Sequence, residues 1–353
     1  MTDSADKIDI KDLTPEQLAD WLQAHGIEPY RAGQVLRWIY SRQADSFDVI
    51  TDIKKELQQL LSNHFSLNRL TQIKVASSAD GSRKYLFKLS DNNCIESVLI
   101  PEKSHLTLCI STQVGCAQGC RFCLTARSGF VRNLTKSEIV SQVRDIMLDQ
   151  DDARQLTNIV LMGMGEPLAN YDNVLRAVET LTNREIGLGF ASRRITISTA
   201  GLVSKLNALG QDTGVNLAVS LNATDNLTRD MLMPINRRYP IEMLLQACRN
   251  YPLPPHRRIT FEYILIKGIN DTPADAGRLA NLLKPIRSKI NLIPFNEHEG
   301  SDFMPPAESE ILRFQEILLQ KNFTVLIRRS KGRDISAACG QLRVKTLPLM
   351  DGR

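Results

Sequence analysis

The chain has 353 residues, of which 42% are hydrophobic and 24% charged, and its formal net charge is +5. This composition excludes an intrinsically disordered chain, and no apolar run approaches the roughly eighteen residues of a membrane helix. The opening residues MTDSADKIDIKDL carry charges where a secretory signal needs an apolar stretch. We therefore expect a cytoplasmic protein with two domains, or with one large barrel and an appendage.

The positive charge is concentrated near the C-terminus. Residues 321–353 hold eight basic and two acidic side chains, which leaves a net charge of −1 on residues 1–320. Such a segment either attracts a phosphate backbone or forms a solvated surface. The seven cysteines are an odd and clustered set, which favours metal binding or thiol chemistry over a disulfide framework.

Residues 1–70 are expected to form a helical domain. Apolar positions recur at helical spacing in LTPEQLADWL, AGQVLRWIY and ITDIKKELQQLL, and Thr14 before Pro15 is typical of a helix start. Tyr30, Trp38 and Tyr40 are typical of a helical core, but they could also stack on bases, and arginines lie near them. We expect this domain to be an accessory that binds RNA.

Residues 71–104 are expected to form a small antiparallel β extension. The segments TQIKVAS, SRKYLFKLS and CIESVLIP are short and partly alternating, and turn-forming residues separate them. The alternation of the third segment, by itself, predicts that Glu96 faces solvent.

From residue 105 onward, strand and helix patterns alternate. Seven segments resemble strands, at 106–111, 158–163, 194–199, 216–221, 259–266, 289–294 and 323–329. Helical patterns lie between them, and one begins with a capping box from Thr135 to Glu138. This alternation predicts an α/β fold with parallel strands, either a partial or complete barrel over residues 105–330 or a doubly wound open sheet. Residues 331–353 are expected to form a separate basic C-terminal segment.

Unusual side chains follow these predicted strands at their carboxyl ends. Because such ends carry the active sites of α/β barrels, we expect these residues to share one pocket. They are Cys116, Cys120, Cys123, Gly165, Glu166, Ser198, Ser220, Asn222 and Asn296.

The segment CAQGCRFC at 116–123 places three thiols within eight residues. Three thiolates on one loop can bind one metal centre, whereas three unrelated buried thiols would be an unusual coincidence. A closed zinc site needs four ligands, and the nearest histidine in sequence is His105. Three thiolates on a cubane iron–sulfur cluster leave one iron open for a small molecule.

The spacing Cys-x3-Cys-x2-Cys after the first strand of a predicted α/β barrel resembles the radical S-adenosylmethionine superfamily. Further motifs resemble the RlmN/Cfr family of RNA methyltransferases over residues 12–347, with the RlmN branch the closer match. These motifs are LTLCISTQVGC, GMGEPL, TISTAG, SLNA, MPIN, IPFN and AACGQL, together with PYRAGQVLRWIY. The resemblance implies a partial (βα)6-type radical S-adenosylmethionine barrel.

The resemblance also implies a role for each matching residue. It implies that Cys339 becomes S-methylated, that Cys109 forms a transient disulfide with it, and that Glu96 accepts a proton. Its implied [4Fe–4S] ligands are Cys116, Cys120 and Cys123, and its implied S-adenosylmethionine pocket comprises Gly165, Glu166, Ser198, Ser220, Leu221, Asn222 and Asn296. Family members usually have His where this chain has Asn222. For Cys94 and Cys248 we expect ordinary buried apolar thiols.

The implied reaction is methylation of adenine C2, an electron-poor carbon that cannot attack a sulfonium methyl group. The family uses two S-adenosylmethionine molecules per turnover, one to methylate the cysteine and one to generate a radical. The cysteine-bound carbon then joins C2, and a disulfide between Cys339 and Cys109 frees the product.

The implied substrates are an adenosine in the peptidyl-transferase centre of 23S rRNA and the adenosine 3′ of the anticodon in some tRNAs. We expect an electron donor such as flavodoxin, no membrane partner and a monomer. Two alternatives remain open at this point. They are a Cfr-like enzyme that methylates C8, and a non-catalytic RNA-binding module with a structural metal.

Overall fold

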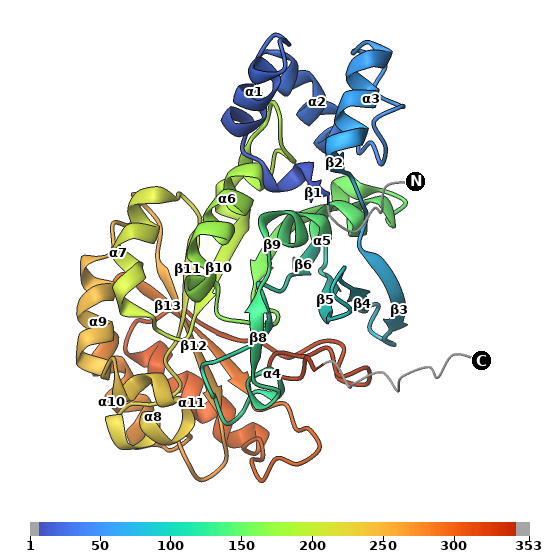
Figure 1. Ribbon diagram of the computed structural model, residues 1–353. Coiled ribbons are helices and arrows are strands. Elements are labelled where there is room, and N and C mark those ends of the chain that lie inside the picture. Colours follow the sequence, from blue (N-terminus) through green and yellow to red (C-terminus); the bar gives the residue numbers. More distant parts are fainter. Residues whose placement is uncertain (1–6, 344–353) are drawn as a thin grey trace.

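The computed structural model describes residues 7–343, so Lys345 and Arg353 of the basic C-terminal segment lie outside the described residues. Helices α1 (Pro15–Ala24), α2 (Arg31–Tyr40) and α3 (Lys55–His64) form a group at one end of the molecule, as Figure 1 shows. Thr14 caps α1 with a full capping box. A short parallel pair, β1 (Ile8–Asp9) with β2 (Phe65–Ser66), joins the two ends of this group.

Ten strands form one large sheet, in the order β14-β13-β12-β11-β10-β9-β6-β5-β4-β3. All seven strands predicted from residue 105 onward are present as parallel neighbours within it. They are β6 (Leu106–Cys109), β9 (Leu156–Leu161), β10 (Ile195–Thr199), β11 (Asn216–Ser220), β12 (Ile259–Leu265), β13 (Ser288–Pro294) and β14 (Val325–Ile327).

The parallel strands follow one another in chain order without a reversal, which is the order of a barrel and excludes a doubly wound sheet. Within the described residues the terminal strands β14 and β3 do not pair, so the barrel is open. The expected partial barrel is therefore confirmed.

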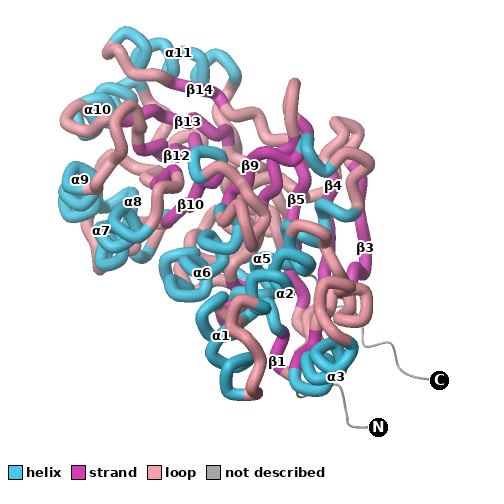
Figure 2. Tube along the Cα trace, turned by 90° about the horizontal axis from the view of Figure 1, so that it is seen from above, coloured by secondary structure: helices cyan, strands magenta, loops and turns pink. Residues whose placement is uncertain are grey.

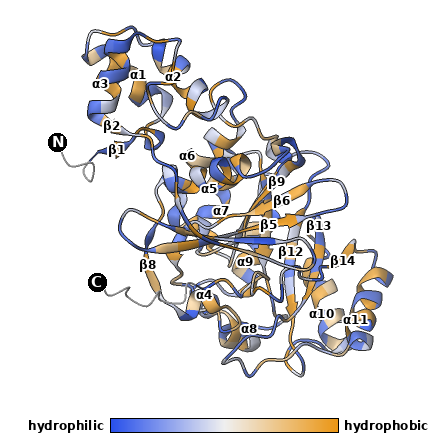
Figure 3. Cartoon of the chain, turned by 90° about the vertical axis from the view of Figure 1, so that its right-hand side faces the viewer, coloured by the Kyte–Doolittle hydropathy of each residue, from blue (hydrophilic) through white to orange (hydrophobic). Residues whose placement is uncertain are grey.

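Helices cover the outer side of this curved sheet, as the view from above in Figure 2 shows. Each predicted helix is present, and α5 begins with the predicted capping box at Thr135. Figure 3 shows apolar and polar colour on different sides of α10 and α11, as expected for helices that bury one face. The helices are α5 (Lys136–Leu148), α6 (Tyr171–Thr182), α7 (Val203–Asp212), α8 (Asn226–Leu232), α9 (Ile241–Asn250), α10 (Pro273–Leu283) and α11 (Glu308–Gln320). Among residues 7–343, none is long and apolar enough to cross a bilayer.

The antiparallel extension continues the large sheet. Strands β3 (Thr71–Ser77), β4 (Arg83–Lys88) and β5 (Cys94–Pro101) pair in succession, and β5 pairs antiparallel with β6. Residues 331–343 of the C-terminal segment fold back over β4 and β5, where Lys84 donates to the Ser336 carbonyl at 3.1 Å. For this reason the prediction of a solvent-facing Glu96 is wrong, and its side chain is only 4% exposed.

A hairpin that the sequence patterns did not predict frames the cysteine loop. Strands β7 (Gln113–Gly115) and β8 (Phe130–Asn133) pair antiparallel, and the loop between them contains the helical turn α4 (Leu124–Arg127). These strands are too short to show a periodic pattern, because only three or four residues contribute to each. The hairpin positions CAQGCRFC at the mouth of the barrel.

Arg144 ties the N-terminal helices to the barrel. Its side chain on α5 is fully buried. The guanidinium donates to the carbonyl oxygens of Ile39, Gln43 and Ala44 and to the carboxylate of Asp45, at distances of 2.5 to 3.2 Å. One side chain therefore satisfies several acceptors in the last turn of α2 and in the loop after it.

Arg144→Met is expected to destabilise the fold by about 3–5 kcal/mol, because it removes the charge that compensates buried acceptors. Chemical denaturation measures this loss directly. Arg313→Met on the exposed side of α11 is the matched control, with an expected change within about 0.5 kcal/mol. A loss below about 1 kcal/mol for Arg144→Met would contradict this role.

Candidate active site

A cavity of about 150 Å³ lies at the carboxyl ends of the parallel strands. Eight of the residues expected at this mouth line it together. They are Cys116, Cys120, Cys123, Gly165, Glu166, Ser198, Ser220 and Cys339. The topology of the barrel thus brings together side chains from five separate parts of the chain.

The backbone of the hairpin holds the cysteine loop closed. Gly115 has φ 75°, and a Cβ atom at this position would lie 1.9 Å from the Gly129 carbonyl oxygen. The Cys116 amide donates to the same oxygen at 2.8 Å, and the Cys123 amide donates to the Cys120 carbonyl at 3.1 Å. Glycine is required where the two strands approach this closely.

The three thiols are desolvated and close enough to affect one another. Burial raises the pKa of Cys116 to about 12 and also raises the pKa of Cys120 and Cys123. The neighbouring thiolates of Cys116 and Cys123 raise the pKa of Cys120 further. Three thiolates at this place therefore need a cationic centre to compensate their charge.

The three thiols could hold an iron–sulfur cluster. In residues 7–343, no group of three or more His, Cys, Asp or Glu side chains is arranged to hold one metal ion. A cubane cluster binds one thiolate at each of three irons, so its ligands need not converge on a single point. The thiols of Cys116, Cys120 and Cys123 line one cavity, as such a cluster requires.

The GMGE turn after β9 packs closely against the hairpin. Gly165 has φ 105°, and a Cβ atom there would lie 2.6 Å from the Gln113 Cβ. The buried Glu166 carboxylate accepts from the Ala200 amide at 2.7 Å and the Leu168 amide at 3.1 Å, while burial raises its pKa. Glu166 therefore fixes the loop after β10 in place at the edge of the cavity.

Three residues of the expected cofactor pocket do not line this cavity. Leu221 and Asn222 are fully buried behind it. The Asn222 amide oxygen accepts from the Ile264 amide at 2.8 Å. Asn296 donates to the Cys339 carbonyl at 3.1 Å, and it thereby holds the C-terminal segment against the barrel.

A second cavity of about 240 Å³ contains both Cys109 and Cys339. It shares Met162, Arg328 and Cys339 with the first cavity, so the two are adjacent. Burial raises the pKa of Cys109 to about 12, with a further contribution from the Cys339 thiolate, whereas the positive charge of Arg328 lowers it. Cys109 and Cys339 thus line the same cavity, although more than two hundred positions separate them in the sequence.

The C-terminal segment reaches this place through bonds to the cysteine loop. The Leu124 amide donates to the Gly340 carbonyl at 2.7 Å, and the Thr125 hydroxyl donates to the Leu342 carbonyl at 2.7 Å. Gln341 donates to the Glu297 carbonyl at 2.7 Å. These bonds bring Cys339 to the barrel mouth.

Glu96 lies beside the second cavity rather than in its lining. Its carboxylate forms an ion pair with Lys84 at 2.9 Å and accepts from the Arg343 amide at 2.9 Å. Burial raises the pKa of Glu96, although Lys84 and the Arg343 amide favour the ionised form. Arg343 follows Leu342, which does line the cavity.

Two further charged residues, Arg328 and Glu262, line the site. Arg328 lines both cavities, and the Cys339 thiolate is the main cause of the raised pKa of this guanidinium. Glu262 on β12 lines the first cavity, and one of its oxygens, Oε2, has no hydrogen-bond partner among the described residues. Glu262 could have been identified from the sequence, because a carboxylate within the apolar run ITFEYILI is unusual.

Known proteins resemble this chain over most of its length. The family described as "Ribosomal RNA large subunit methyltransferase N-terminal domain" matches residues 8–67, and the radical SAM superfamily matches residues 110–280. The dual-specificity RNA methyltransferase RlmN of Desulfosudis oleivorans is 59% identical, with 95% of this chain and 90% of that protein covered. That of Geobacter sulfurreducens is 54% identical, with 96% and 92% covered.

A solved structure gives the same assignment. The radical SAM methyltransferase from Sphaerobacter thermophilus superposes with a TM-score of 0.90 at 43% identity, covering 96% of this chain and 100% of that one. With two cavities that share Cys339 beside three cysteines on one loop, this chain belongs to the RlmN family of radical S-adenosylmethionine RNA methyltransferases.

Proposed function

We propose that this chain methylates C2 of an adenine in 23S rRNA and in tRNAs, by way of an S-methylated Cys339. The single observation that carries this proposal is that Cys339 borders both cavities, one with the three loop cysteines and one with Cys109. A thiol in this position can face the cofactor on one side and a partner thiol on the other. A structural metal module has no need of such a shared thiol.

The residues of the first cavity fit the cofactors of the superfamily. Cys116, Cys120 and Cys123 would hold one [4Fe–4S] cluster, and Gly165, Ser198 and Ser220 would border S-adenosylmethionine. When bound, these groups supply a methyl group and a 5′-deoxyadenosyl radical. The unpartnered Glu262 oxygen offers a further acceptor for hydroxyl or amino groups in the same cavity.

Cys339 and Cys109 carry out the covalent steps that belong to the protein. The Cys339 sulfur takes a methyl group by displacement, and it later links RNA to the chain through that carbon. Glu96 would accept the C2 proton, and the one electron that the linked species must lose would pass to a bound cluster as its acceptor. The Cys109 thiolate then attacks the Cys339 sulfur. The S–S bond forms, the S–C bond breaks, and the carbon leaves with the electron pair and takes up a proton. Arg328 lines this cavity and favours the thiolate that the attack requires.

Nucleoside mass spectrometry tests this proposal. The anaerobically reconstituted and reduced protein is incubated with S-adenosylmethionine and with unmodified 23S rRNA or tRNA, and the RNA is then digested. We expect 2-methyladenosine, with two S-adenosylmethionine molecules consumed per methylated base in the first turnover. A product of 8-methyladenosine would instead support Cfr-like chemistry, and no methylated adenosine from protein with a full cluster would overturn the substrate assignment.

The further partners are part of the same proposal. Electron delivery to a cluster requires a reduced donor, for which a flavodoxin is suitable, and a thiol reductant must reopen the Cys109–Cys339 disulfide after each turnover. The protein is proposed to act as a monomer. Analytical ultracentrifugation of the protein with and without RNA would check this.

Glu96→Gln is expected to lower methylation by about 10²–10⁴-fold, because glutamine cannot accept the C2 proton but still accepts from the Arg343 amide. A base acts in its ionised form, and burial raises the pKa of Glu96. Methylation by the parent protein should therefore fall as the pH is lowered through that raised pKa. The acid limb of the pH–rate profile should be absent from the variant.

The exposed Glu316→Gln on α11 is the matched control, and its pH profile should equal that of the parent. If Glu96→Gln keeps both the rate and the acid limb, Glu96 does not accept the proton. If it loses activity but also loses the ordered C-terminal segment, limited proteolysis after residue 330 will reveal that structural cause.

A further inference from the structure

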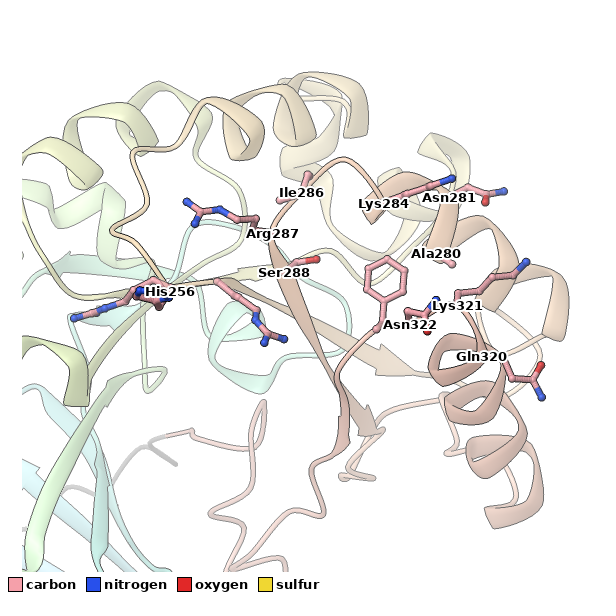
Figure 4. A pocket seen from close by; sticks show the side chains of 13 residues that line it. His256, Ala280, Asn281, Lys284, Ile286, Arg287, Ser288, Gln320, Lys321 and Asn322 are labelled. Atoms are coloured by element: carbon pink, nitrogen blue, oxygen red, sulfur yellow. The ribbon is translucent and has the colours of Figure 1, made fainter.

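A groove of about 690 Å³ lies at the opposite end of the sheet from the active site. Its lining comes from the residues that directly precede β12, β13 and β14, and from the carboxyl ends of α10 and α11. Figure 4 shows these side chains arranged around one space, with Lys284 and Asn281 on one side, Arg287 and Ser288 on another, and Lys321 on a third. The groove is therefore formed by three adjacent strand–helix units.

The lining of the groove is strongly basic. It contains five permanently cationic side chains, and neither Asp nor Glu is present. Within residues 7–343, none of the five forms an ion pair with a carboxylate, although thirteen ion pairs occur elsewhere. The five residues are Arg257, Arg258, Lys284, Arg287 and Lys321.

The ends of the two helices explain only part of this charge. Lys284 and Lys321 are the C-cap residues of α10 and α11, where a cation offsets the partial negative charge of the helix end. Each helix end contributes about half an elementary charge, so the lysines leave a net positive charge. The three arginines come from loops and have no such role.

The arginines donate to neutral oxygens, which orient them without removing their charge. These bonds join Arg257 Nη1 to Asn216 Oδ1 at 2.9 Å, Arg258 Nη1 to Thr324 Oγ1 at 2.7 Å, and Arg287 Nη2 to the Leu253 carbonyl at 3.4 Å. A guanidinium held by a neutral acceptor keeps its remaining donors for an anion.

The groove also contains an unused polar group and an aromatic ring. Ser288 is 8% exposed, and its hydroxyl has no hydrogen-bond partner among the described residues. Phe323 lines the same groove and is half-buried. Five cations beside an aromatic ring suit a ligand that carries both negative charge and planar bases.

We propose that this groove binds the sugar–phosphate backbone of the substrate RNA, at a distance from the modified adenine. The inference rests on the proposed function, which makes RNA the polyanion that the chain must hold. The seven residues of β12 separate the groove from the active site by about 20 Å. Exposed cations along an open groove suit a continuous phosphate backbone, and Phe323 offers a surface on which a base can stack.

A consequence is that long RNAs bind more tightly than short ones. The path over the surface from the active site to the groove is longer than β12 itself, which spans about 20 Å. We expect a stem-loop held at the active site to leave the groove empty. Full-length tRNA or a folded rRNA fragment can contact both places. The groove thus contributes affinity for large folded substrates without contact with the reacting atoms.

The test compares two triple variants with the parent in RNA-binding assays over a range of salt concentrations. The groove variant is Lys284→Gln, Arg287→Gln and Lys321→Gln, and the control variant is Lys205→Gln, Arg249→Gln and Arg313→Gln on exposed positions of α7, α9 and α11. Both variants lose three positive charges, so general electrostatic attraction falls equally. The probes are full-length tRNA and a short anticodon stem-loop.

The groove variant is expected to bind full-length tRNA about 30-fold more weakly than the parent, with a salt slope reduced by about 2. Its affinity for the stem-loop should change no more than that of the control variant. Equal weakening by both variants, or a parent that binds the two RNAs equally, would overturn the inference. Inorganic pyrophosphate that binds the groove without competing with tRNA would also overturn it. Nucleoside mass spectrometry with the parent reports separately on the proposed function, so the two can fail independently.

Discussion

Cys339→Ala is expected to lower methylation of RNA by at least about 10⁴-fold while leaving RNA binding unchanged. Alanine removes the sulfur that accepts the methyl group and forms the covalent link to RNA, and the chain has no other thiol that borders both cavities among its described residues. The measurement is nucleoside mass spectrometry for methylation and a filter-binding assay for affinity. Peptide mass spectrometry should find S-methylcysteine at position 339 in the parent and in no peptide of the variant.

The variant Cys109→Ala distinguishes formation of the covalent link between Cys339 and RNA from cleavage of that link. Cys339 can still join to RNA in this variant, but the S–C bond is not broken by disulfide formation. A covalent RNA–protein adduct should therefore accumulate, which a denaturing gel detects as a band that ribonuclease treatment shifts. Cys248→Ala is the control, because Cys248 is buried on α9 and lines neither cavity.

The outcomes distinguish the catalytic mechanism from a structural role. If Cys339→Ala keeps methylation, the cysteine-linked route is excluded. If Cys109→Ala turns over normally, another group resolves the adduct. A metal-binding module without catalysis would give the same result for the parent and for all three variants.

The second large effect is expected from the cysteine loop. Cys116→Ser, Cys120→Ser or Cys123→Ser should each remove most of the bound iron and sulfide and abolish cleavage of S-adenosylmethionine. The reason is that each of the three thiolates would bind a different cluster iron, so the two remaining thiols cannot replace the one that is removed. Iron and acid-labile sulfide analysis, together with detection of 5′-deoxyadenosine, measures both effects without RNA.

Cys94→Ser is the matched control, because it removes a buried thiol that lies outside the first cavity. It should retain iron and cleave S-adenosylmethionine at the rate of the parent. Retention of a full cluster by all three loop variants would contradict the ligand assignment. Loss of zinc rather than iron from the parent on chelation would show that the loop binds a different metal.

Much of the fold could be predicted from periodicity. The seven parallel strands and the helices between them appear where apolar alternation and helical spacing place them, and the capping box at Thr135 is present. These signals are local, because each strand or helix must present apolar side chains at its own period. Similarly, Cys94 and Cys248 are buried as expected for isolated thiols. Strands β7 and β8 are too short to show a periodic hydrophobic pattern. For this reason the sequence did not predict the hairpin that they form.

The site was predictable where its residues form a compact motif or follow a strand. CAQGCRFC, Gly165, Glu166, Ser198 and Ser220 were identified in this way, and they line one cavity. Glu262 was missed because a single charged residue within a strand is usually a surface residue. Leu221, Asn222 and Asn296 lie outside the lining of this cavity, and their assignment to the cofactor pocket stays a prediction.

By itself, the sequence determined the α/β fold class and the family, because periodicity and short motifs involve neighbouring residues. Only the tertiary structure decided that Cys109 and Cys339 face one cavity, that Glu96 is buried, and that five cations meet in a groove. Each of these three features depends on which distant segments of the chain pack against one another. The C-terminal segment covers β4 and β5 through bonds between residues about 250 positions apart, such as Lys84 with Ser336 and Glu96 with Arg343. Contacts of that kind arise from the packing of the whole chain, and no local pattern encodes them.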